Sequence, residues 1–156
     1  MKIMIIFFTL LSIIYGQNLK LFTLCEGNFG SANSSLWSSS LNGGGMHDIV
    51  HWDESSNPLG DVGQSMSVYQ EKLYIIMNNS HTIEVMSLAG GIYYESTLDL
   101  PSSSPRYITF NGEKGYISSW NLNAILILNL NNMEIIDTVE IDGKPEKMIY
   151  FEDHLY

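Results

Sequence analysis

The side chains best suited to hold a ligand lie in turns between short apolar segments. Arg106 is the only arginine of the chain, and its guanidinium can clamp a carboxylate or a phosphate through two parallel hydrogen bonds. Trp120 follows an apolar segment and offers a flat face on which a planar group can stack. The other candidate ligand-binding residues in these turns are Phe29, Asp61, Gln64, Asn79, Asn121 and Glu146. These residue types favour binding of a polar, anionic or planar molecule.

Each candidate also has a purely structural interpretation. Arg106 would then pair with an acid of a neighbouring unit, for instance Asp61, and Trp120 would pack between units. Phe29 would fix its own turn, and Asp61 would cap backbone N–H groups. The asparagines would be turn formers, because their side chains bond to nearby backbone and tolerate left-handed conformations. Both interpretations stay open at the level of the sequence.

Catalytic and metal-binding patterns are weak in this chain. The serine runs 38–40 and 102–104 lack the strand–turn–helix context of a nucleophile elbow. His47 and His51 fall in an expected strand, where four residues span about 13 Å, too far to share one zinc ion. Phosphate-binding loops, dinucleotide fingerprints and calcium loops do not occur in the sequence. We therefore predict a non-enzymatic protein with no catalytic residue, metal site or cofactor.

The element that must position the candidates is a repeat of about 40 residues with about four short strands per unit. Pro105 matches Pro145 and Phe110 matches Tyr150 at one spacing. Such a period predicts an all-β propeller made of four-stranded antiparallel blades. The expected units cover residues 19–52, 65–100, 105–141 and 145–156, the last a stub. We expect the partial propeller to occupy residues 17–156, about three blades plus the stub, with further blades encoded beyond Tyr156.

In a propeller, the turns after the second strands and the connections between blades meet on one face, around the central axis. Ligands bind there because loops from successive blades converge on one funnel. Arg106, Gln64 and Glu146 would begin inner strands beside the axis. The loops expected on this face are residues 26–33, 57–64, 78–81, 101–106, 119–123 and 142–146.

The overall charge and the first residues restrict the possible partners. The formal net charge is −10, with only seven basic residues, so the chain cannot neutralise a nucleic-acid backbone. Its acids are scattered, Glu84 and Asp61 among them, and we expect them to lie on a solvated surface. Residues 1–16 resemble a cleavable signal peptide, which predicts export and no membrane span after cleavage; an uncleaved anchor is the alternative. A lone cysteine, Cys25, permits no internal disulfide and is expected to be partly buried at a strand end.

Two runs carry a family resemblance: Cys-Glu-Gly-Asn-Phe-Gly at 25–30 and Pro-Leu-Gly-Asp-Val-Gly-Gln-Ser-Met at 58–66. In combination they resemble the YncE-like surface β-propellers of Bacteroidetes and related bacteria, over residues 19–156. The resemblance implies seven blades and a secreted or lipid-anchored protein of the bacterial periplasm or cell surface. Some members capture cobalamin for an outer-membrane transporter. Cys25 departs from the pattern, because relatives usually have a polar residue there.

The function expected from these observations is an exported, non-enzymatic binding module. Its partner would be a small molecule, with a corrinoid as one candidate, or an outer-membrane transporter protein. Two alternatives stay open. One is a propeller enzyme of the lactonase or hydrolase type, and the other is a structural surface-layer repeat protein with no ligand.

Overall fold

The computed structural model describes residues 20–40, 45, 47, 48 and 58–156. The expected signal peptide, His51 and most of the expected strand at 46–52 lie outside the described residues. Within the described ranges, no helix is long and apolar enough to cross a membrane.

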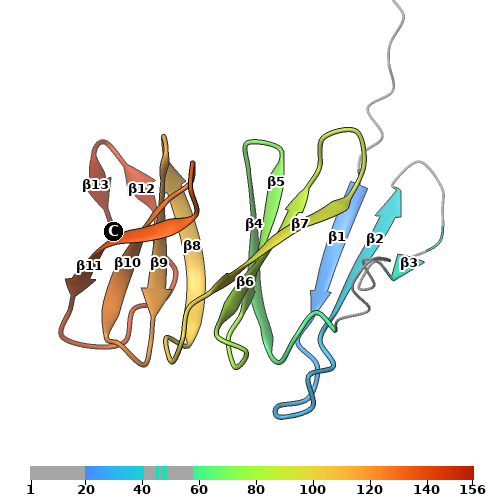
Figure 1. The fold of residues 1–156 in the computed structure, drawn as a ribbon, viewed down its shortest axis with the longest axis horizontal. Helices are drawn as coiled ribbons and strands as arrows, with labels where there is room; N and C mark the ends of the chain where they lie inside the picture. The colour runs from blue at the N-terminus through green and yellow to red at the C-terminus, as the bar shows by residue number, and fades with distance from the viewer. Residues whose placement is uncertain (1–19, 41–44, 46, 49–57) are drawn as a thin grey trace, which may run out of the picture.

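The described residues form antiparallel sheets that stand side by side (Figure 1). The first sheet, blade 1, contains β1 (Lys20–Cys25), β2 (Ser35–Ser40) and β3 (His47–Asp48). Blade 2 contains β4 (Gly63–Tyr69), β5 (Lys72–Met77), β6 (Thr82–Ser87) and β7 (Tyr93–Asp99). Blade 3 contains β8 (Pro105–Asn111), β9 (Lys114–Ser119), β10 (Ala124–Asn129) and β11 (Glu134–Glu140). A hairpin of β12 (Tyr150–Phe151) and β13 (His154–Leu155) follows.

The strands of each blade are joined as a meander, in the order β4-β5-β6-β7 and β8-β9-β10-β11. The tight turns at Gln70 and Glu71 and at Gly112 have positive φ, which closes a two-residue hairpin with the right twist. β5 is buried over five consecutive residues, as expected for a strand covered on both faces. The expectation of an all-β chain with four-stranded antiparallel blades is confirmed.

Two apolar cores fill the spaces between blades, and each buried Leu or Ile in them contributes about 1.5–3 kcal/mol. The core between blades 1 and 2 contains Leu36, Leu59, Leu73, Ile75, Met77 and Met86. The core between blades 2 and 3 contains Tyr74, Ile76, Ile83, Val85, Leu100, Ile108, Ile117, Leu126 and Leu128. Alternate residues of β6 therefore face opposite blades, because successive side chains of a strand point to opposite sides.

An aromatic contact recurs from one blade boundary to the next. Tyr74 of β5 lies 4.9 Å, centroid to centroid, from Phe110 of β8. Tyr116 of β9 lies 5.9 Å from Tyr150 of β12. The hairpin β12–β13 therefore sits against blade 3 much as blade 3 sits against blade 2.

Three expectations about exposure were wrong. Asp61 and Glu84 are not solvated surface acids, because their residues are only 7% and 6% exposed. Cys25 is exposed rather than partly buried. Glu84 lies on β6 of blade 2 beside the buried residues Ile83 and Val85, and Asp61 accepts hydrogen bonds from residues of two neighbouring loops.

Candidate functional site

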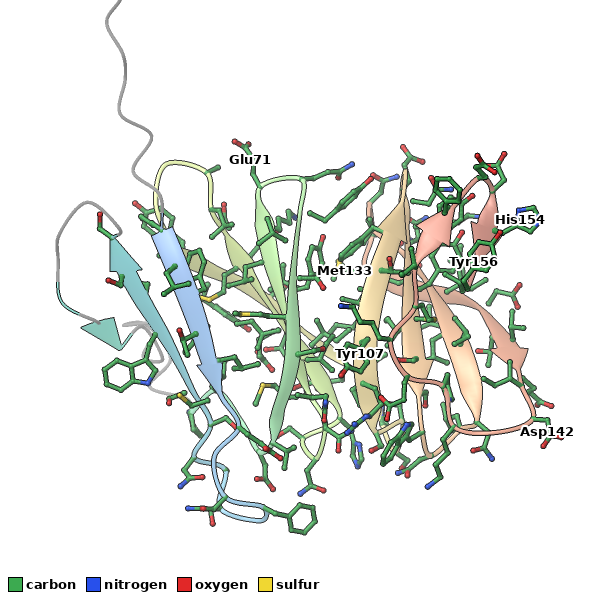
Figure 2. The ribbon with its side chains drawn as sticks, turned by 180° about the vertical axis from the view of Figure 1, so that it is seen from behind. Glu71, Tyr107, Met133, Asp142, His154 and Tyr156 are labelled. Carbon is green, nitrogen blue, oxygen red and sulfur yellow. The ribbon has the colours of Figure 1, made fainter. Side chains whose placement is uncertain are left out.

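The described turns between β1 and β2, between β5 and β6 and between β9 and β10 lie at one end of the sheets, and so do the described connections that lead into β4, β8 and β12 (Figure 1). We call this end the loop face; its described loops are residues 26–34, 58–62, 78–81, 100–104, 120–123 and 141–146. Figure 2 shows Asp142 at this end and Glu71, in the β4–β5 turn, at the opposite end. Backbone bonds tie the loops together, for example from the Asn78 N–H to the Val62 carbonyl at 2.8 Å and from Trp120 to Ser104 at 3.1 Å.

Arg106 is the centre of a polar cluster on the loop face. Its Nε and Nη2 donate to the two carboxylate oxygens of Glu146 at 3.2 and 3.3 Å, and its Nη1 donates to Oε1 of Gln64. Gln64 and Arg106 are each the second residue of an inner strand, β4 and β8. Glu146 follows Pro145, the repeat partner of Pro105. Equivalent positions of three successive units thus meet side by side.

Trp120 forms the floor of this cluster. The guanidinium carbon of Arg106 lies 4.0 Å from the centre of the Trp120 ring, and Nζ of Lys144 lies 5.1 Å from it. A cation over an indole face is attracted by the ring quadrupole. The buried Trp120 Nε1 has no hydrogen-bond partner among the described residues. We call Gln64, Arg106, Trp120 and Glu146 the Arg106 cluster.

The Arg106 cluster has the chemistry of an anion-binding site in which the carboxylate of Glu146 occupies the place of the anion. The Arg106 side chain is 17% exposed and that of Glu146 is 47% exposed, so the carboxylate is the more solvated partner. An incoming carboxylate or phosphate can replace Glu146 on the same two guanidinium nitrogens. The structural alternative for Arg106 named the wrong acid, because its partner is Glu146 and not Asp61.

Asp61 and Asn79 are brought together, but at a separate place on the loop face. Oδ2 of Asp61 accepts from Nδ2 of Asn79 at 2.6 Å and from the Gly30 N–H at 2.9 Å. The Asp61 N–H donates to Oγ of Ser80 at 2.8 Å. The Asn79 amide, together with backbone N–H groups of residues 30–32, holds the pKa of the Asp61 carboxyl below its usual value, against the opposing effect of burial. Asp61 therefore acts as a clamp between loops of blades 1 and 2.

The backbone next to this clamp depends on a glycine. Gly60 has a φ of +131°, in a region that residues with a Cβ rarely adopt. A Cβ built there would lie 2.8 Å from Oγ of Ser80, the acceptor for the Asp61 N–H. Gly60 thus lets two loops approach closely enough for the carboxylate of Asp61 to reach its donors.

The remaining two predicted residues do not join either group. Phe29 is 80% exposed, so the interpretation that it fixes its own turn is wrong. Asn121 is exposed; its backbone N–H donates to the Ser103 carbonyl at 3.1 Å. The loop face thus contains the four-residue Arg106 cluster, the Asp61–Asn79 clamp, and two outlying side chains.

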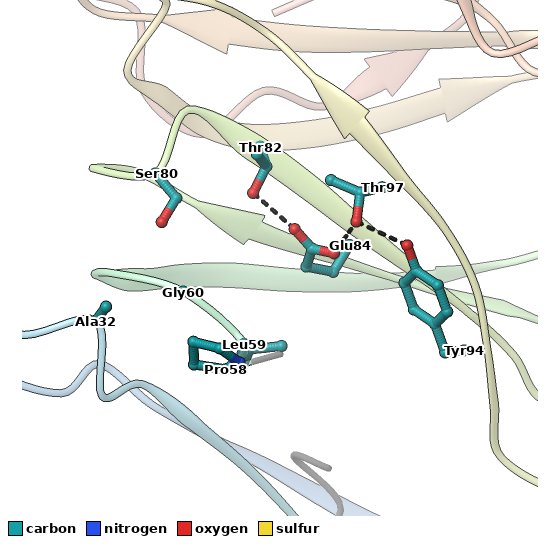
Figure 3. A pocket seen from close by; sticks show the side chains of 9 residues that line it. All are labelled: Ala32, Pro58, Leu59, Gly60, Ser80, Thr82, Glu84, Tyr94 and Thr97. Atoms are coloured by element: carbon teal, nitrogen blue, oxygen red, sulfur yellow. Dashed lines mark hydrogen bonds between the residues drawn. The ribbon is translucent and has the colours of Figure 1, made fainter. Parts of the chain in front are cut away.

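Sequence reasoning missed a cleft between blades 1 and 2, which borders on the loop face (Figure 3). It has a volume of about 320 Å³ and is lined by Ala32, Pro58, Leu59, Gly60, Ser80, Thr82, Glu84, Tyr94 and Thr97. Hydroxyls of Thr82 and Thr97 donate to the Glu84 carboxylate at 2.7 and 2.5 Å. Burial raises the pKa of the Glu84 carboxyl above its ordinary value. The available signal was a glutamate in the strand Thr82–Ser87, whose other central residues are Ile83, Val85 and Met86.

No group of three or more His, Cys, Asp or Glu side chains able to hold a metal ion occurs in the part of the chain that the structure describes. His47, the described member of the expected histidine pair, lies in β3.

Residues 20–156 match the family described as a domain of unknown function, DUF5074. The chain belongs to the DUF5074 family. It is also similar to a chain in the crystal structure of a nidogen/laminin complex, with a TM-score of 0.54 and 18% identity over 78% of this chain. A second similar structure is apo AztD from Citrobacter koseri, with a TM-score of 0.44 and 12% identity over 77% of this chain. No curated protein matches.

The likeness to the chain in the nidogen/laminin complex, together with the antiparallel four-stranded sheets, confirms the fold as a β-propeller. The DUF5074 chain spans 43% of the length of the chain in the nidogen/laminin complex and 35% of the AztD chain. At these identities the likeness concerns the fold alone. The finer resemblance to YncE-like surface propellers stays a prediction.

Proposed function

We propose that this DUF5074 chain is an exported, non-enzymatic binding module that takes its ligand on the loop face, at the Arg106 cluster. The observation that supports the proposal best is the meeting of Gln64, Arg106 and Glu146, from three successive units, above the face of Trp120. Loops of several blades that converge on one point are the usual place for a propeller ligand.

The chemistry of the Arg106 cluster defines the ligand class. A ligand with one carboxylate or phosphate would replace Glu146 on the guanidinium. A planar part next to that anion would extend over Trp120, and amide groups would bond to Gln64. A small molecule of this kind fits better than a protein surface, because the cluster is compact and Arg106 is largely covered.

A corrinoid is the most specific ligand that we propose. Cobalamin combines a flat macrocycle, peripheral amides and a phosphodiester, which match Trp120, Gln64 and Arg106 in that order. The resemblance to YncE-like propellers points to the same ligand, delivered to an outer-membrane transporter from the periplasm or the cell surface. Export itself rests on residues 1–16.

Isothermal titration of the chain with cyanocobalamin tests this assignment. The wild type should bind with a saturable heat, and Arg106→Gln should weaken binding by at least about tenfold, since a charged hydrogen bond is worth about 1.5–3 kcal/mol. Lys114→Gln is the matched control, because Lys114 begins β9 at the end of blade 3 away from the loop face, and it should leave binding unchanged. Absence of heat with the folded wild type would refute the corrinoid assignment. Equal binding by Arg106→Gln would place any site away from the Arg106 cluster.

A further inference from the structure

The cleft between blade 1 and blade 2 has features of a second binding site, independent of the loop-face proposal. It is bounded on one side by Pro58 and Leu59 and on the other by β6 and β7. Glu84 lies there between the hydroxyl groups of Thr82 and Thr97 (Figure 3). Its volume of about 320 Å³ is at the small end of the range for ligand pockets. A small organic molecule would fit, whereas a macrocycle would not.

The charge of the cleft is unbalanced. Glu84 is the only acidic residue among the lining residues, and none of these is basic. Asp99, in β7, adds a second negative charge near enough to disfavour ionisation of Glu84. A buried carboxylate that has no cationic partner, as Glu84 has none among the residues that the structure describes, is costly because burial removes water that would stabilise the charge. A bound cation would supply the missing partner.

Two hydroxyl groups orient the Glu84 carboxylate, and its oxygens can still accept further hydrogen bonds. Thr82 Oγ1 donates to Oε1 and Thr97 Oγ1 donates to Oε2, so each oxygen keeps a further lone pair. The Tyr94 hydroxyl lies 2.9 Å from Oγ1 of Thr97 and completes a chain of hydrogen bonds. Together these contacts fix the rotamer of a side chain that is only 6% exposed.

The equivalent position in the next blade shows that the fold does not require an acid here. Glu84 pairs with Thr97 across β6 and β7, and Leu126 pairs with Thr138 across β10 and β11. Leu126 belongs to the apolar core between blades 2 and 3. The carboxylate at position 84 is therefore a feature of this cleft and not of the blade architecture.

From these contacts we infer that the cleft binds a small organic ammonium ion, with the Glu84 carboxylate as its counter-ion and Leu59 and Pro58 against its apolar part. A primary ammonium group carries three donors, which match the two carboxylate oxygens and the hydroxyl of Ser80 or Thr82. A divalent metal fits less well, because calcium takes six to eight oxygen ligands and magnesium demands an octahedral set. Among the lining residues only one carboxylate is present.

The test is an NMR titration of the ¹⁵N-labelled chain with n-propylammonium chloride, at constant ionic strength maintained with sodium chloride. Amide signals of Thr82, Glu84 and Thr97 should shift and saturate, while those of Gln64 and Arg106 should not. The neutral analogue 1-propanol should bind at least about tenfold more weakly, since it lacks the charge that the carboxylate recognises. Equal shifts with both compounds, or no saturable shift with propylammonium, would overturn the inference.

A second experiment replaces the Glu84 carboxylate. Glu84→Gln keeps the size of the side chain and should weaken propylammonium binding at least about tenfold. Glu140→Gln, on the exposed strand β11, is the matched control and should bind like the wild type. Undiminished binding by Glu84→Gln would refute the role of the carboxylate. If Glu84→Gln does not fold, the comparison of propylammonium with 1-propanol on the wild type still decides.

Discussion

The guanidinium carbon of Arg106 lies 4.0 Å from the centre of the Trp120 ring, while its nitrogens face Glu146 and Gln64. Arg106 is the second residue of β8, and Trp120 follows β9, the neighbouring strand of the same blade. The stack fixes the plane of the guanidinium, so its donors point across the blade boundaries rather than into solvent. An anion can then be recognised without first ordering the arginine.

Glu146→Gln should strengthen binding of a ligand that places an anionic group on Arg106, because the substitution removes the carboxylate that competes for the guanidinium. Exposed ion pairs are worth about 1 kcal/mol or less, so we expect a gain in affinity of about tenfold or less and little change in stability. Titration calorimetry with cyanocobalamin measures the affinity, and urea denaturation measures the stability. Glu140→Gln should change neither. Weaker binding by Glu146→Gln would mean that Glu146 itself contacts the ligand.

Asp61→Asn should destabilise the chain at neutral pH, because a neutral amide is a weaker acceptor for the Gly30 N–H and the Asn79 amide. The pKa of Asp61 is lowered on folding, so its contribution is present above the ordinary value of 3.8 and is lost as the pH falls through the folded value. The melting temperatures of the wild type and Asp61→Asn should therefore converge in acid. Asp142→Asn, on an exposed loop residue, should melt like the wild type throughout. A constant difference between Asp61→Asn and the wild type at all pH values would contradict this account.

Glu84→Gln should have the opposite pH dependence. Burial raises the pKa of Glu84 on folding, so the contribution of its protonated form is present below the ordinary value of 4.5 and is lost as the pH rises through the folded value. The free energy of unfolding of the wild type should fall over that window relative to Glu84→Gln. Urea denaturation from pH 4 to pH 8, with Glu140→Gln as control, measures the difference. Parallel curves for wild type and Glu84→Gln would show that Glu84 titrates alike in both states.

Ile83→Ala should lower the free energy of unfolding by about 2–5 kcal/mol, because it leaves a cavity in the core between blades 2 and 3. Ile83 has 0% exposure in that core. Ile136→Ala, at a side chain that is 49% exposed on β11, should cost much less. Equal losses for the two variants, measured by urea denaturation, would indicate that the two blades do not pack together in solution.

The strand pattern of this protein can be predicted from its sequence because each blade repeats the same order of short apolar runs and polar turns. Apolar runs such as Leu73–Met77 end in turns with residues that tolerate positive φ, and hydrogen bonds between neighbours fix the register. The members of the Arg106 cluster were predictable as candidates, because Gln64, Arg106 and Glu146 occupy equivalent positions of successive units, but the pairing of Arg106 with Glu146 was not. Trp120 was identified as a stacking residue, although its partner was not.

Side-chain partners across loops were not predictable, because they depend on the exact approach of segments far apart in sequence. Asp61 and Asn79 form a structural clamp only because Gly60 lets their loops meet. Glu84 was interpreted as a surface acid because composition counts charges without saying which face of a strand carries them. Met86, two residues further along and on the same face as Glu84, was the one local sign that this second face of the strand is buried as well.

The most direct measurement of the central claim is the indole N–H signal of Trp120 during titration of the ¹⁵N-labelled chain with cyanocobalamin. Binding at the Arg106 cluster predicts that the Trp120 signal shifts saturably while that of Trp37, in β2, stays in place. The same titration of Arg106→Gln should require at least about tenfold more ligand. A Trp120 signal that stays unchanged at saturating ligand would contradict a binding site on the loop face.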